Sequence, residues 1–347
     1  MRLDYLLIFY GFHYNRQGLD LNMEFSRRGM KSKLLTFGDK SYNNVISMKC
    51  LQTNTSFLSK FYVLLNVMHF IIKGLKYKPQ NIVAYNKISL QIALIFGLIN
   101  RSRIFYYALE FERLNAVNKY ILKKFCLGII NVEENRQRIL KDQIGWNKHE
   151  VVFYNMPHQI NYSDIQPKLR KWLHANHSIS KETRIIIYSG TDQRYSNLEN
   201  IISWTKELSI DIILVLMLPV ISLRIRNLVD NRVILLPSQP PEEVINWLCE
   251  ADIALLPYEG NDIAVKYCSP QKLFDSMAAG VPIIGSNRPI IKKVLREFQF
   301  GITCDFTCKE AYLNAIQSFL SRPIEDFKME ARRGHRYYNY ESQFPKL

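Results

Sequence analysis

The segment SPQKLFDSMAAGVPIIGSN, from Ser269 to Asn287, predicts a helix followed by a buried strand. Ser269 is a favourable N-cap residue, and Pro270 suits the first helical position. Gly280 predicts the end of the helix, and the apolar VPIIG that follows predicts a short buried strand. Helical spacing places four apolar side chains on one face of this helix: Leu273, Phe274, Met277 and Ala278.

Two charged residues, Lys272 and Asp275, lie three positions apart on another face of the same helix. A cation and a carboxylate near a helix start, followed by a turn that contains glycine and proline, suit a nucleotide diphosphate with its ribose. A capped surface helix with an ordinary Lys–Asp pair is the alternative interpretation.

The length and charge of the whole chain indicate its domain number and its partners. A chain of 347 residues favours two domains, and 48% hydrophobic with 22% charged residues is typical of a folded protein. Residues 1–170 contain 25 Lys and Arg against 11 Asp and Glu, whereas residues 171–347 contain 21 against 20. The basic first half predicts an anionic partner there, either a phospholipid surface, a phosphorylated lipid or a nucleic acid.

Cysteines and apolar runs bear on the compartment. The six cysteines lack the spacing of a metal site, and we expect them to be reduced. Residues 1–10 lack a basic leader and a cleavage site, and no apolar run reaches the roughly 18 residues of a membrane span. We therefore expect a cytoplasmic protein.

Strand and helix patterns alternate along the whole chain, which predicts an α/β fold with two doubly wound parallel sheets. The strands expected in the first half are Tyr5–Gly11, Lys33–Gly38, Ile82–Tyr85, Ile104–Tyr107, Gly128–Val132 and Val151–Tyr154. Those expected in the second half are Arg184–Gly190, Ile212–Leu218, Val233–Leu236, Ile253–Pro257, Ile283–Ile284 and Gly301–Thr303. Ser196 with Glu199 predicts a capping box at the start of the next helix. In such folds a ligand lies at the carboxyl ends of the strands.

Residues 57–78, FLSKFYVLLNVMHFIIKGLKYK, form an almost wholly apolar helical pattern with one narrow polar stripe. Asn66, His69, Lys73 and Lys76 make up the stripe, and residues 51–100 contain no acidic residue. Such a helix suits an anionic membrane surface, where each basic residue contributes about 1 kcal/mol to attachment. A core helix of the first domain with one wet edge is the alternative.

Two stretches of the second half resemble the donor-binding domain of GT-B glycosyltransferases, specifically glycosyltransferase family 4. NRVILLPSQPPEEVINWLCEADIALLPY, Asn231–Tyr258, resembles a strand, a "Pro-x-Glu-Glu" helix and an "AD-hydrophobic-PY" strand of that family. SPQKLFDSMAAGVPIIGSN resembles the helix that follows them. The likeness runs from Ile185 to about Asp305, whereas the first half matches only in VEENRQRIL at Val132–Leu140 and NMP at Asn155–Pro157.

The resemblance implies a Rossmann-like acceptor domain over residues 1–157 and a Rossmann-like nucleotide-sugar domain over residues 158–325. Residues 326–347 are then expected to cross back to the first domain. The family moves a sugar from a nucleotide diphosphate to an acceptor, with retention of the anomeric configuration and without a bound metal or cofactor. With the basic first half, this leads us to expect a lipid-linked saccharide acceptor, bacterial surface polysaccharide synthesis (lipopolysaccharide or capsule), and peripheral attachment to the cytoplasmic face of the membrane.

Without a metal, the protein must supply positive charge and backbone N–H groups at the diphosphate. The resemblance implies that Arg194, in the loop after the Arg184–Gly190 strand, and Lys272 are the cations; a solvated loop arginine is the alternative for Arg194. Asp275 stands where the family has a ribose-binding glutamate, and Tyr267 where many members have a glutamate at the sugar. The further donor contacts implied are Gly190, Thr191, Tyr258, Ser269, Pro270 and Gln271.

Fewer residues point to the acceptor side. The turn Gly11–Gly18 resembles the loop whose backbone approaches the donor phosphate and the acceptor, with Gly18 at the closest approach. Glu110 follows the Ile104–Tyr107 strand at its carboxyl end, and we expect it to take part in catalysis. Helix capping is the alternative for Glu110 and for Glu112.

Two other functions remain open from the sequence. A nucleotide-sugar epimerase shares the GT-B architecture, although it normally needs acidic residues and histidines at the sugar, and few histidines are candidates. A basic nucleic-acid-binding protein would need interleaved aromatic and basic residues or a recognition helix, and neither pattern is found.

Overall fold

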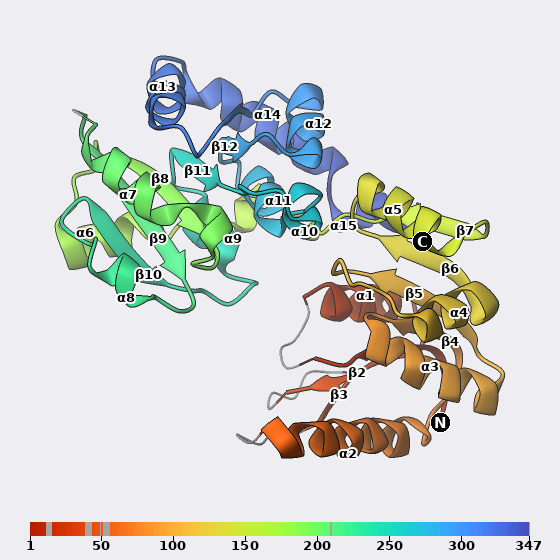
Figure 1. Cartoon of the computed structure of the whole chain (residues 1–347). Coiled ribbons are helices and arrows are strands. Elements are labelled where there is room, and N and C mark those ends of the chain that lie inside the picture. Colours follow the sequence, from red (N-terminus) through yellow and green to blue (C-terminus); the bar gives the residue numbers. More distant parts are fainter. Residues whose placement is uncertain (12–15, 39–43, 49, 51–55, 209, 347) are drawn as a thin grey trace. The chain divides into compact units, whose positions relative to one another are not determined.

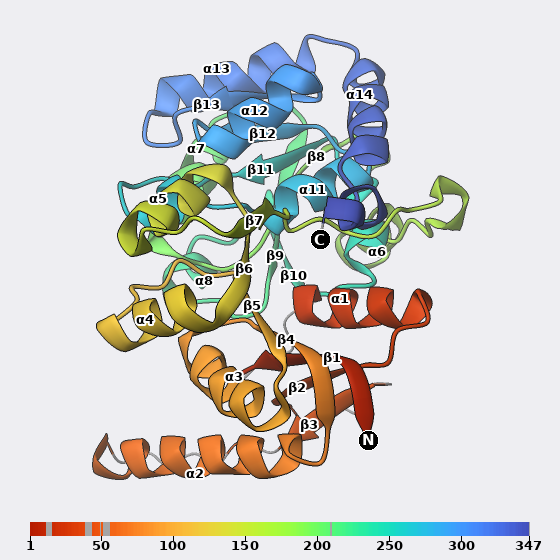
Figure 2. The same cartoon turned by 90° about the vertical axis from the view of Figure 1, so that its right-hand side faces the viewer.

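The computed structural model describes residues 1–11, 16–38, 44–48, 50, 56–208 and 210–346. These residues form two compact units: unit 1, which is Met1–Tyr154 together with Lys346, and unit 2, which is Asn155–Pro345. Each unit is a parallel sheet with helices packed on its faces (Figure 1; Figure 2). The predicted α/β architecture with two doubly wound sheets is therefore confirmed.

Unit 1 contains, among the described residues, a seven-stranded sheet in the order β3-β2-β1-β4-β5-β6-β7 with parallel neighbours throughout. Its strands are β1 (Arg2–Phe9), β2 (Ser32–Phe37), β3 (Val45–Met48), β4 (Lys78–Ala84), β5 (Arg103–Ala108), β6 (Cys126–Asn131) and β7 (His149–Val152). Its helices are α1 (Arg16–Arg27), α2 (Ser56–Gly74), α3 (Lys87–Asn100), α4 (Ala116–Phe125) and α5 (Glu134–Ile144).

Three details of unit 1 differ from expectation. Strand β3 was not predicted, because four residues are too few to show a period. Helix α2 ends at Gly74 rather than at residue 78, since Lys78 already begins β4. Gly18, expected in a loop, lies in the first turn of α1 and is buried, while residues 12–15 of the expected turn lie outside the described residues.

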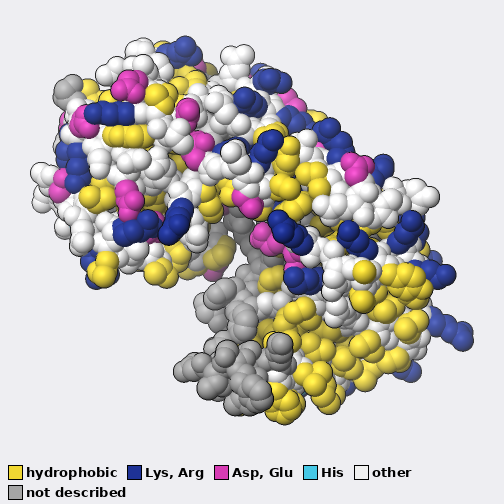
Figure 3. Space-filling view, viewed as in Figure 1, with side chains coloured by type: hydrophobic (Ala, Val, Ile, Leu, Met, Phe, Trp, Pro, Cys, Tyr) yellow, Lys and Arg dark blue, Asp and Glu magenta, His cyan; other side chains and the backbone are white. Residues whose placement is uncertain are grey.

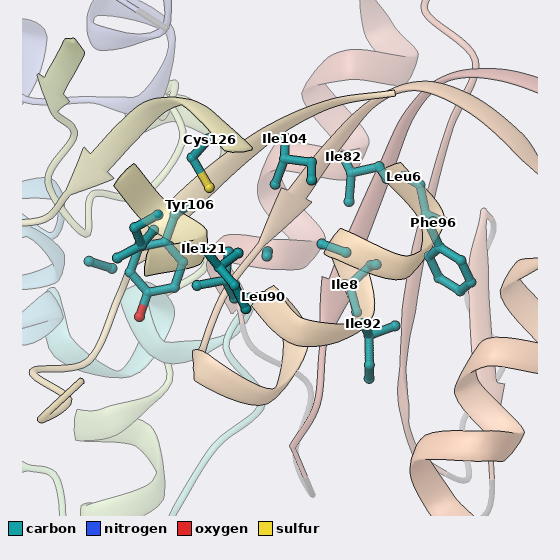
Figure 4. Packing of buried hydrophobic residues seen from close by; sticks show 14 of the residues in the cluster. Leu6, Ile8, Ile82, Leu90, Ile92, Phe96, Ile104, Tyr106, Ile121 and Cys126 are labelled. Carbon is teal, nitrogen blue, oxygen red and sulfur yellow. The ribbon is translucent and has the colours of Figure 1, made fainter. Parts of the chain in front are cut away.

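The core of unit 1 lies between the sheet and helices α3 and α4 (Figure 4). Leu6 and Ile8 of β1, Ile82 of β4 and Ile104 of β5 are at most 3% exposed and pack against Phe96 and other apolar side chains. Helices cover the sheet because the strands of a parallel sheet are apolar on both faces.

Unit 2 contains a six-stranded sheet in its described part, in the order β10-β9-β8-β11-β12-β13, again parallel throughout. Its strands are β8 (Arg184–Ser189), β9 (Ile212–Leu218), β10 (Val233–Pro237), β11 (Ile253–Leu256), β12 (Ile283–Ser286) and β13 (Gly301–Cys304). Its α-helices are α6 (Leu169–His177), α7 (Leu198–Lys206), α8 (Leu223–Arg226), α9 (Val244–Leu248), α10 (Ile263–Lys266), α11 (Gln271–Ala278), α12 (Pro289–Glu297), α13 (Lys309–Leu320), α14 (Ile324–Tyr337) and α15 (Tyr340–Gln343). Short 3-10 turns are η1 (Tyr162–Asp164), η2 (Arg194–Ser196) and η3 (Phe344–Lys346).

Two predicted helix caps in unit 2 are wrong. Instead of Ser196, Asn197 precedes α7, and the Ser196 hydroxyl donates to the Gln193 carbonyl oxygen at 2.5 Å. Pro270 rather than Ser269 occupies the N-cap position of α11, which has no side-chain cap. A serine caps a helix only when its oxygen reaches the N–H groups of the first turn, and here both helices start later than the sequence pattern indicates.

Gly280 terminates the α11 region as predicted. Its φ of +69° lies in the left-handed region that glycine adopts without strain. A Cβ built at this position would lie 3.1 Å from Nε of Arg332 on α14, so the close packing of α14 also favours glycine.

No helix in the described part of the chain combines the length and apolar character that crossing a bilayer requires.

Candidate active site

The strand order of unit 2 reverses at β8, whose neighbours are β9 and β11. The connections that follow β8 and β11 therefore diverge at the carboxyl edge of the sheet, which is the position where α/β proteins bind ligands. Gly190 and Thr191 follow β8, and Tyr258 follows β11. Helix α11, which carries Lys272, packs against β11.

The amine of Lys272 lies between aromatic rings at this edge. Its Nζ is 4.3 Å from the ring centroid of Tyr188 and 5.2 Å from that of Tyr258. A Cβ built on Gly190 would lie 2.3 Å from the same Nζ, so the amine also lies against the loop that follows β8. No described carboxylate lies within ion-pair distance of Lys272, and ring faces are its cation-stabilising contacts.

Burial without a carboxylate partner changes the acidity of Lys272. Loss of hydration lowers its pKa to about 7, and the neighbouring Cys268 thiol acts in the opposite direction. An anion placed beside this amine would raise its pKa again, because opposite charges stabilise each other. The site therefore presents a titratable amine for which no residue in the described part of the chain supplies a counter-charge.

The loop after β8 is held in place by tyrosines. The ring of Tyr195 stacks on that of Tyr258, with centroids 5.6 Å apart and planes 12° apart. The Tyr195 carbonyl oxygen accepts a hydrogen bond from the Glu259 N–H at 2.7 Å. The Tyr188 hydroxyl donates to the Thr191 carbonyl oxygen at 2.8 Å. Loop, strand ends and amine thus form one connected frame.

Sequence reasoning missed Tyr188 and Tyr195 as parts of this frame. The available signal was an aromatic residue at the carboxyl end of a buried strand, in RIIIYSG, followed by a second one in the loop. Tyr258, for which a core position and a site position were both open, is buried and also faces the amine.

Glu259 joins the ends of neighbouring strands next to the site. Its Oε1 accepts from the Ser286 hydroxyl at 2.5 Å and from the Phe306 N–H at 3.3 Å. Its Oε2 lies 3.4 Å from the Arg288 guanidinium, and the Ser286 oxygen accepts from the Tyr258 N–H at 2.8 Å. These bonds fix where Tyr258 stands.

Arg194 lies in η2 and is exposed. It borders a polar depression lined by Asp192, Gln193, Asn197, Leu198, Glu199 and Arg224. Asp192 accepts hydrogen bonds from the Ser222 hydroxyl and from Arg224, the latter at 3.2 Å. Arg194 itself has no ion pair with any carboxylate that the structure describes, so its charge is open to solvent.

At the start of α11, Ser269 and Asp275 are both buried, and Gln271 is half-buried. The Ser269 hydroxyl lacks a hydrogen-bond partner among the described groups, while its carbonyl oxygen accepts from the Asn155 side chain at 3.1 Å. Lys272 makes no ion pair with Asp275, so the alternative of a surface Lys–Asp pair is wrong.

Tyr267 stands at the position where many members of the resembling family have a glutamate. It follows the short helix α10 as its C-cap residue and is half-buried. The Lys266 amine lies 5.2 Å from its ring centroid. This position therefore offers an aromatic ring beside a cation rather than an acid.

In unit 1, the two acidic candidates have different surroundings. Glu112 accepts a hydrogen bond from the Lys87 N–H at 2.7 Å and another from the Tyr106 hydroxyl at 3.3 Å. It therefore satisfies the first N–H of α3, whose N-cap residue is Asn86. Glu110 is exposed and borders a small cavity with Asn131 and Arg136. Partial loss of hydration raises the pKa of Glu110, the Arg136 guanidinium lowers it, and Glu112 raises it. Glu110 is thus the more accessible of the two carboxylates.

Comparisons with known proteins address the chain as a whole. Residues 170–340 match the model of the glycosyl transferases group 1 family. No curated protein matches the sequence significantly. Sucrose-phosphate synthase from Thermosynechococcus elongatus is similar in structure, with 14% identity and a TM-score of 0.73, covering 98% of this chain and 96% of that one.

Two further solved structures are similar over nearly their whole length. HepE from Anabaena, solved with UDP and glucose, has 13% identity and a TM-score of 0.71, with 97% of this chain and 96% of that one covered. The lipopolysaccharide outer core galactosyltransferase WaaB has 13% identity and a TM-score of 0.62, with 100% and 98% covered. Residues 170–340 thus belong to the glycosyl transferases group 1 family, and the chain is a glycosyltransferase of the GT-B fold.

Proposed function

We propose that this protein is a retaining, metal-independent glycosyltransferase of family 4, which transfers a sugar from a nucleotide diphosphate sugar to a lipid-linked saccharide. The observation that carries the proposal is the Lys272 amine, which lacks a carboxylate partner and lies against Gly190, Tyr188 and Tyr258 at the carboxyl edge of unit 2. A diphosphate supplies the missing negative charge.

The reaction explains why such a cation is needed. The bond between the anomeric carbon and the diphosphate oxygen breaks, and its electron pair stays on the diphosphate. The acceptor hydroxyl oxygen bonds to the anomeric carbon, and its proton passes to the released diphosphate. Negative charge therefore grows on the leaving group, and preorganised positive charge stabilises that transition state by an amount worth about 100- to 1,000-fold in rate per group.

Individual residues have distinct proposed roles. Lys272 and Arg194 neutralise the diphosphate, while the backbone of Gly190 and Thr191 approaches it from the loop after β8. Asp275 is the proposed ribose ligand, and its shorter side chain replaces the family's glutamate. The remaining donor contacts are proposed for Tyr258, Ser269, Pro270 and Gln271, at the ends of β11 and the start of α11. The buried Ser269 hydroxyl without a partner supports this placement, since a ligand can satisfy it.

For the donor nucleotide, the HepE structure with UDP and glucose makes UDP-sugars the first choice to test. For the acceptor, we propose that unit 1 binds a lipid-linked saccharide, with Glu110 near the reacting hydroxyl and Gly18 at the phosphate. The similarity to WaaB, a lipopolysaccharide outer core galactosyltransferase, supports a role in bacterial surface polysaccharide synthesis, and the excess of basic residues in residues 1–170 supports attachment to the cytoplasmic face of an anionic membrane.

The proposal is tested by a thermal-shift screen with UDP-glucose, UDP-galactose, UDP-N-acetylglucosamine and GDP-mannose. A donor that binds the folded site stabilises it by about 2.7 kcal/mol at a concentration of 100 Kd. The stabilising donor is then incubated with the protein and anionic lipid, and nucleotide diphosphate release is measured. Absence of both a shift and release with every donor would contradict the proposed function.

A further inference from the structure

Helix α2 exposes an apolar face to solvent. Phe61, Leu64, Met68 and Ile72 recur at helical spacing and are 55%, 56%, 49% and 60% exposed. The expected polar stripe does not form the opposite, wet side, because its first member, Asn66, is only 3% exposed. Helix α2 therefore does pack on the core of unit 1, through Phe70, but its exposed side is apolar rather than the polar wet edge of that interpretation.

Two neighbouring helices extend this apolar surface. Helix α3 packs against both α2 and α4. Leu98 and Ile99 of α3 are 63% and 59% exposed, and Val117 and Tyr120 of α4 are 59% and 60% exposed. Figure 3 shows hydrophobic side chains gathered over these three helices. We call this the three-helix face; a contiguous apolar surface of this kind marks an interaction site.

Basic residues border the three-helix face along one edge. In a parallel sheet with crossover helices, helix ends and strand starts lie at the same edge. Six exposed basic residues lie at these points. Lys73 and Lys76 lie at the end of α2 and in the connection to β4, Arg101 and Arg103 lie between α3 and the start of β5, and Lys123 and Lys124 lie in the last turn of α4. None of them pairs with a carboxylate that the structure describes. We call these residues the basic rim.

Charge distinguishes between the partners that could cover the face. Residues 61–127 contain ten Lys and Arg but two acidic residues, Glu110 and Glu112. A second copy of the chain, joined through a two-fold axis, would bring this basic surface against itself, and like charges repel. An anionic bilayer offers acyl chains for the apolar side chains and phosphate groups for the rim.

We propose that the three-helix face lies in the interface of an anionic bilayer, with α2, α3 and α4 contacting the acyl boundary and the basic rim contacting headgroups. The proposal deepens the proposed function, since a lipid-linked acceptor is met at such a surface. Membrane binding itself can be measured without donor or acceptor, so its failure and that of the transferase proposal are distinguishable.

The test is co-sedimentation of the purified full chain with vesicles of phosphatidylcholine alone and of phosphatidylcholine with 30 mol% phosphatidylglycerol. Wild type is expected to pellet with the anionic vesicles only, and less as salt rises. The double substitution L64E/L98E places two carboxylates in the face, and we expect at least a tenfold loss of binding. The double substitution K123Q/K124Q removes two rim charges, which corresponds to a loss of roughly 30-fold at about 1 kcal/mol per residue.

Matched controls separate the face from general charge effects. The first control, V220E/L223E, adds the same charge at two apolar residues of unit 2 that are 75% and 73% exposed. The second control, K266Q, removes one exposed positive charge from unit 2. For both controls we expect binding to anionic vesicles within twofold of that of wild type. L64E/L98E should also keep the wild-type melting temperature and donor-induced shift, which shows that it folds.

Three outcomes would overturn the proposal. One is equal pelleting with neutral and anionic vesicles, and another is L64E/L98E that pellets as wild type does. The third combines two results: light scattering shows a lipid-free dimer that L64E/L98E dissociates, and wild type does not bind vesicles. The face would then be an interface between copies of the chain.

Discussion

Units 1 and 2 share a strand order around their first strand, since β1 lies between β2 and β4 just as β8 lies between β9 and β11. They place cations differently. Unit 2 encloses one amine, Lys272, within an aromatic frame, whereas unit 1 carries unpaired basic residues on the outside beside exposed apolar helices. The same topology therefore supports a preorganised small-molecule site in one unit and an extended docking surface in the other.

The difference teaches that the fold determines where a site lies and the side chains determine what it binds. A buried cation without a partner is costly in water-free surroundings and is retained where a ligand completes it. Exposed cations act collectively and depend on salt. Changes in the two units should thus separate donor binding from membrane binding.

The largest expected effect is that of Lys272→Ala in unit 2. It should abolish the donor-induced thermal shift and lower transfer by about 100- to 1,000-fold, because a charge that stabilises the leaving diphosphate is lost. The melting temperature without donor should hardly change, since no ion pair is broken. Lys292→Ala, which removes an exposed lysine of α12, is the matched control. A normal donor-induced thermal shift in the Lys272 variant would contradict the proposal that this amine neutralises the diphosphate.

Glu110→Gln and Glu112→Ala should sharpen the contrast within unit 1. The first is expected to lower kcat by roughly 100-fold, because the carboxylate proposed to orient the reacting hydroxyl is lost, with an unchanged melting temperature. The second removes the cap on the Lys87 N–H and should lower stability by about 1 kcal/mol, with a smaller effect on kcat. Steady-state kinetics and thermal unfolding on both variants check this; equal kcat values for Glu110→Gln and wild type would contradict the role of Glu110.

Donor binding should depend on pH through Lys272. Its pKa is lowered from 10.5 to about 7 by burial, so the unfolded chain binds more protons between these values and unliganded stability rises with pH there. Diphosphate binding then takes up a proton, and affinity should fall as pH rises above 7, approaching about tenfold per pH unit. Calorimetry in buffers of different ionisation enthalpy measures the uptake, which Lys272→Met should remove.

Gly190→Ala is the mildest test. The new methyl group would lie 2.3 Å from the Lys272 amine, which is too close for an ordinary contact. The amine must therefore move, and it can do so because it is the flexible end of its side chain. We expect about a tenfold loss of UDP affinity, equivalent to about 1.4 kcal/mol, and little change in vesicle binding. Calorimetric titration with UDP provides the measurement, and unaltered affinity would show that the amine does not contact the diphosphate.

The sequence predicted the sheets better than the helix starts. Buried runs such as IILVLML, Ile212–Leu218, are wholly apolar because both faces are covered, and the structure reproduces that strand residue for residue. The caps at Ser196 and Ser269 were wrong because a side-chain oxygen near a helix start says nothing about which N–H it reaches. Four residues of β3 carried too little pattern to be noticed.

The candidate site was predicted in part. Motif spacing brought Gly190, Tyr258 and Lys272 into consideration, and the structure places all three together. The aromatic frame was missed because Tyr188 and Tyr195 fit ordinary strand and loop positions. Only the three-dimensional arrangement shows the Lys272 amine over the Tyr188 ring and the Tyr195 ring stacked on Tyr258. For α2, hydropathy showed an apolar helix but could not show that one apolar side faces outward.

The central claim, that fixed side-chain cations rather than a metal neutralise the diphosphate, is tested most directly by calorimetric titration of UDP into wild type and Lys272→Ala. Each titration is made once in EDTA and once in Mg²⁺. We predict equal wild-type affinity in both buffers and lost binding of the variant in both. Wild-type binding that disappears in EDTA, or a variant that Mg²⁺ restores, would contradict the account.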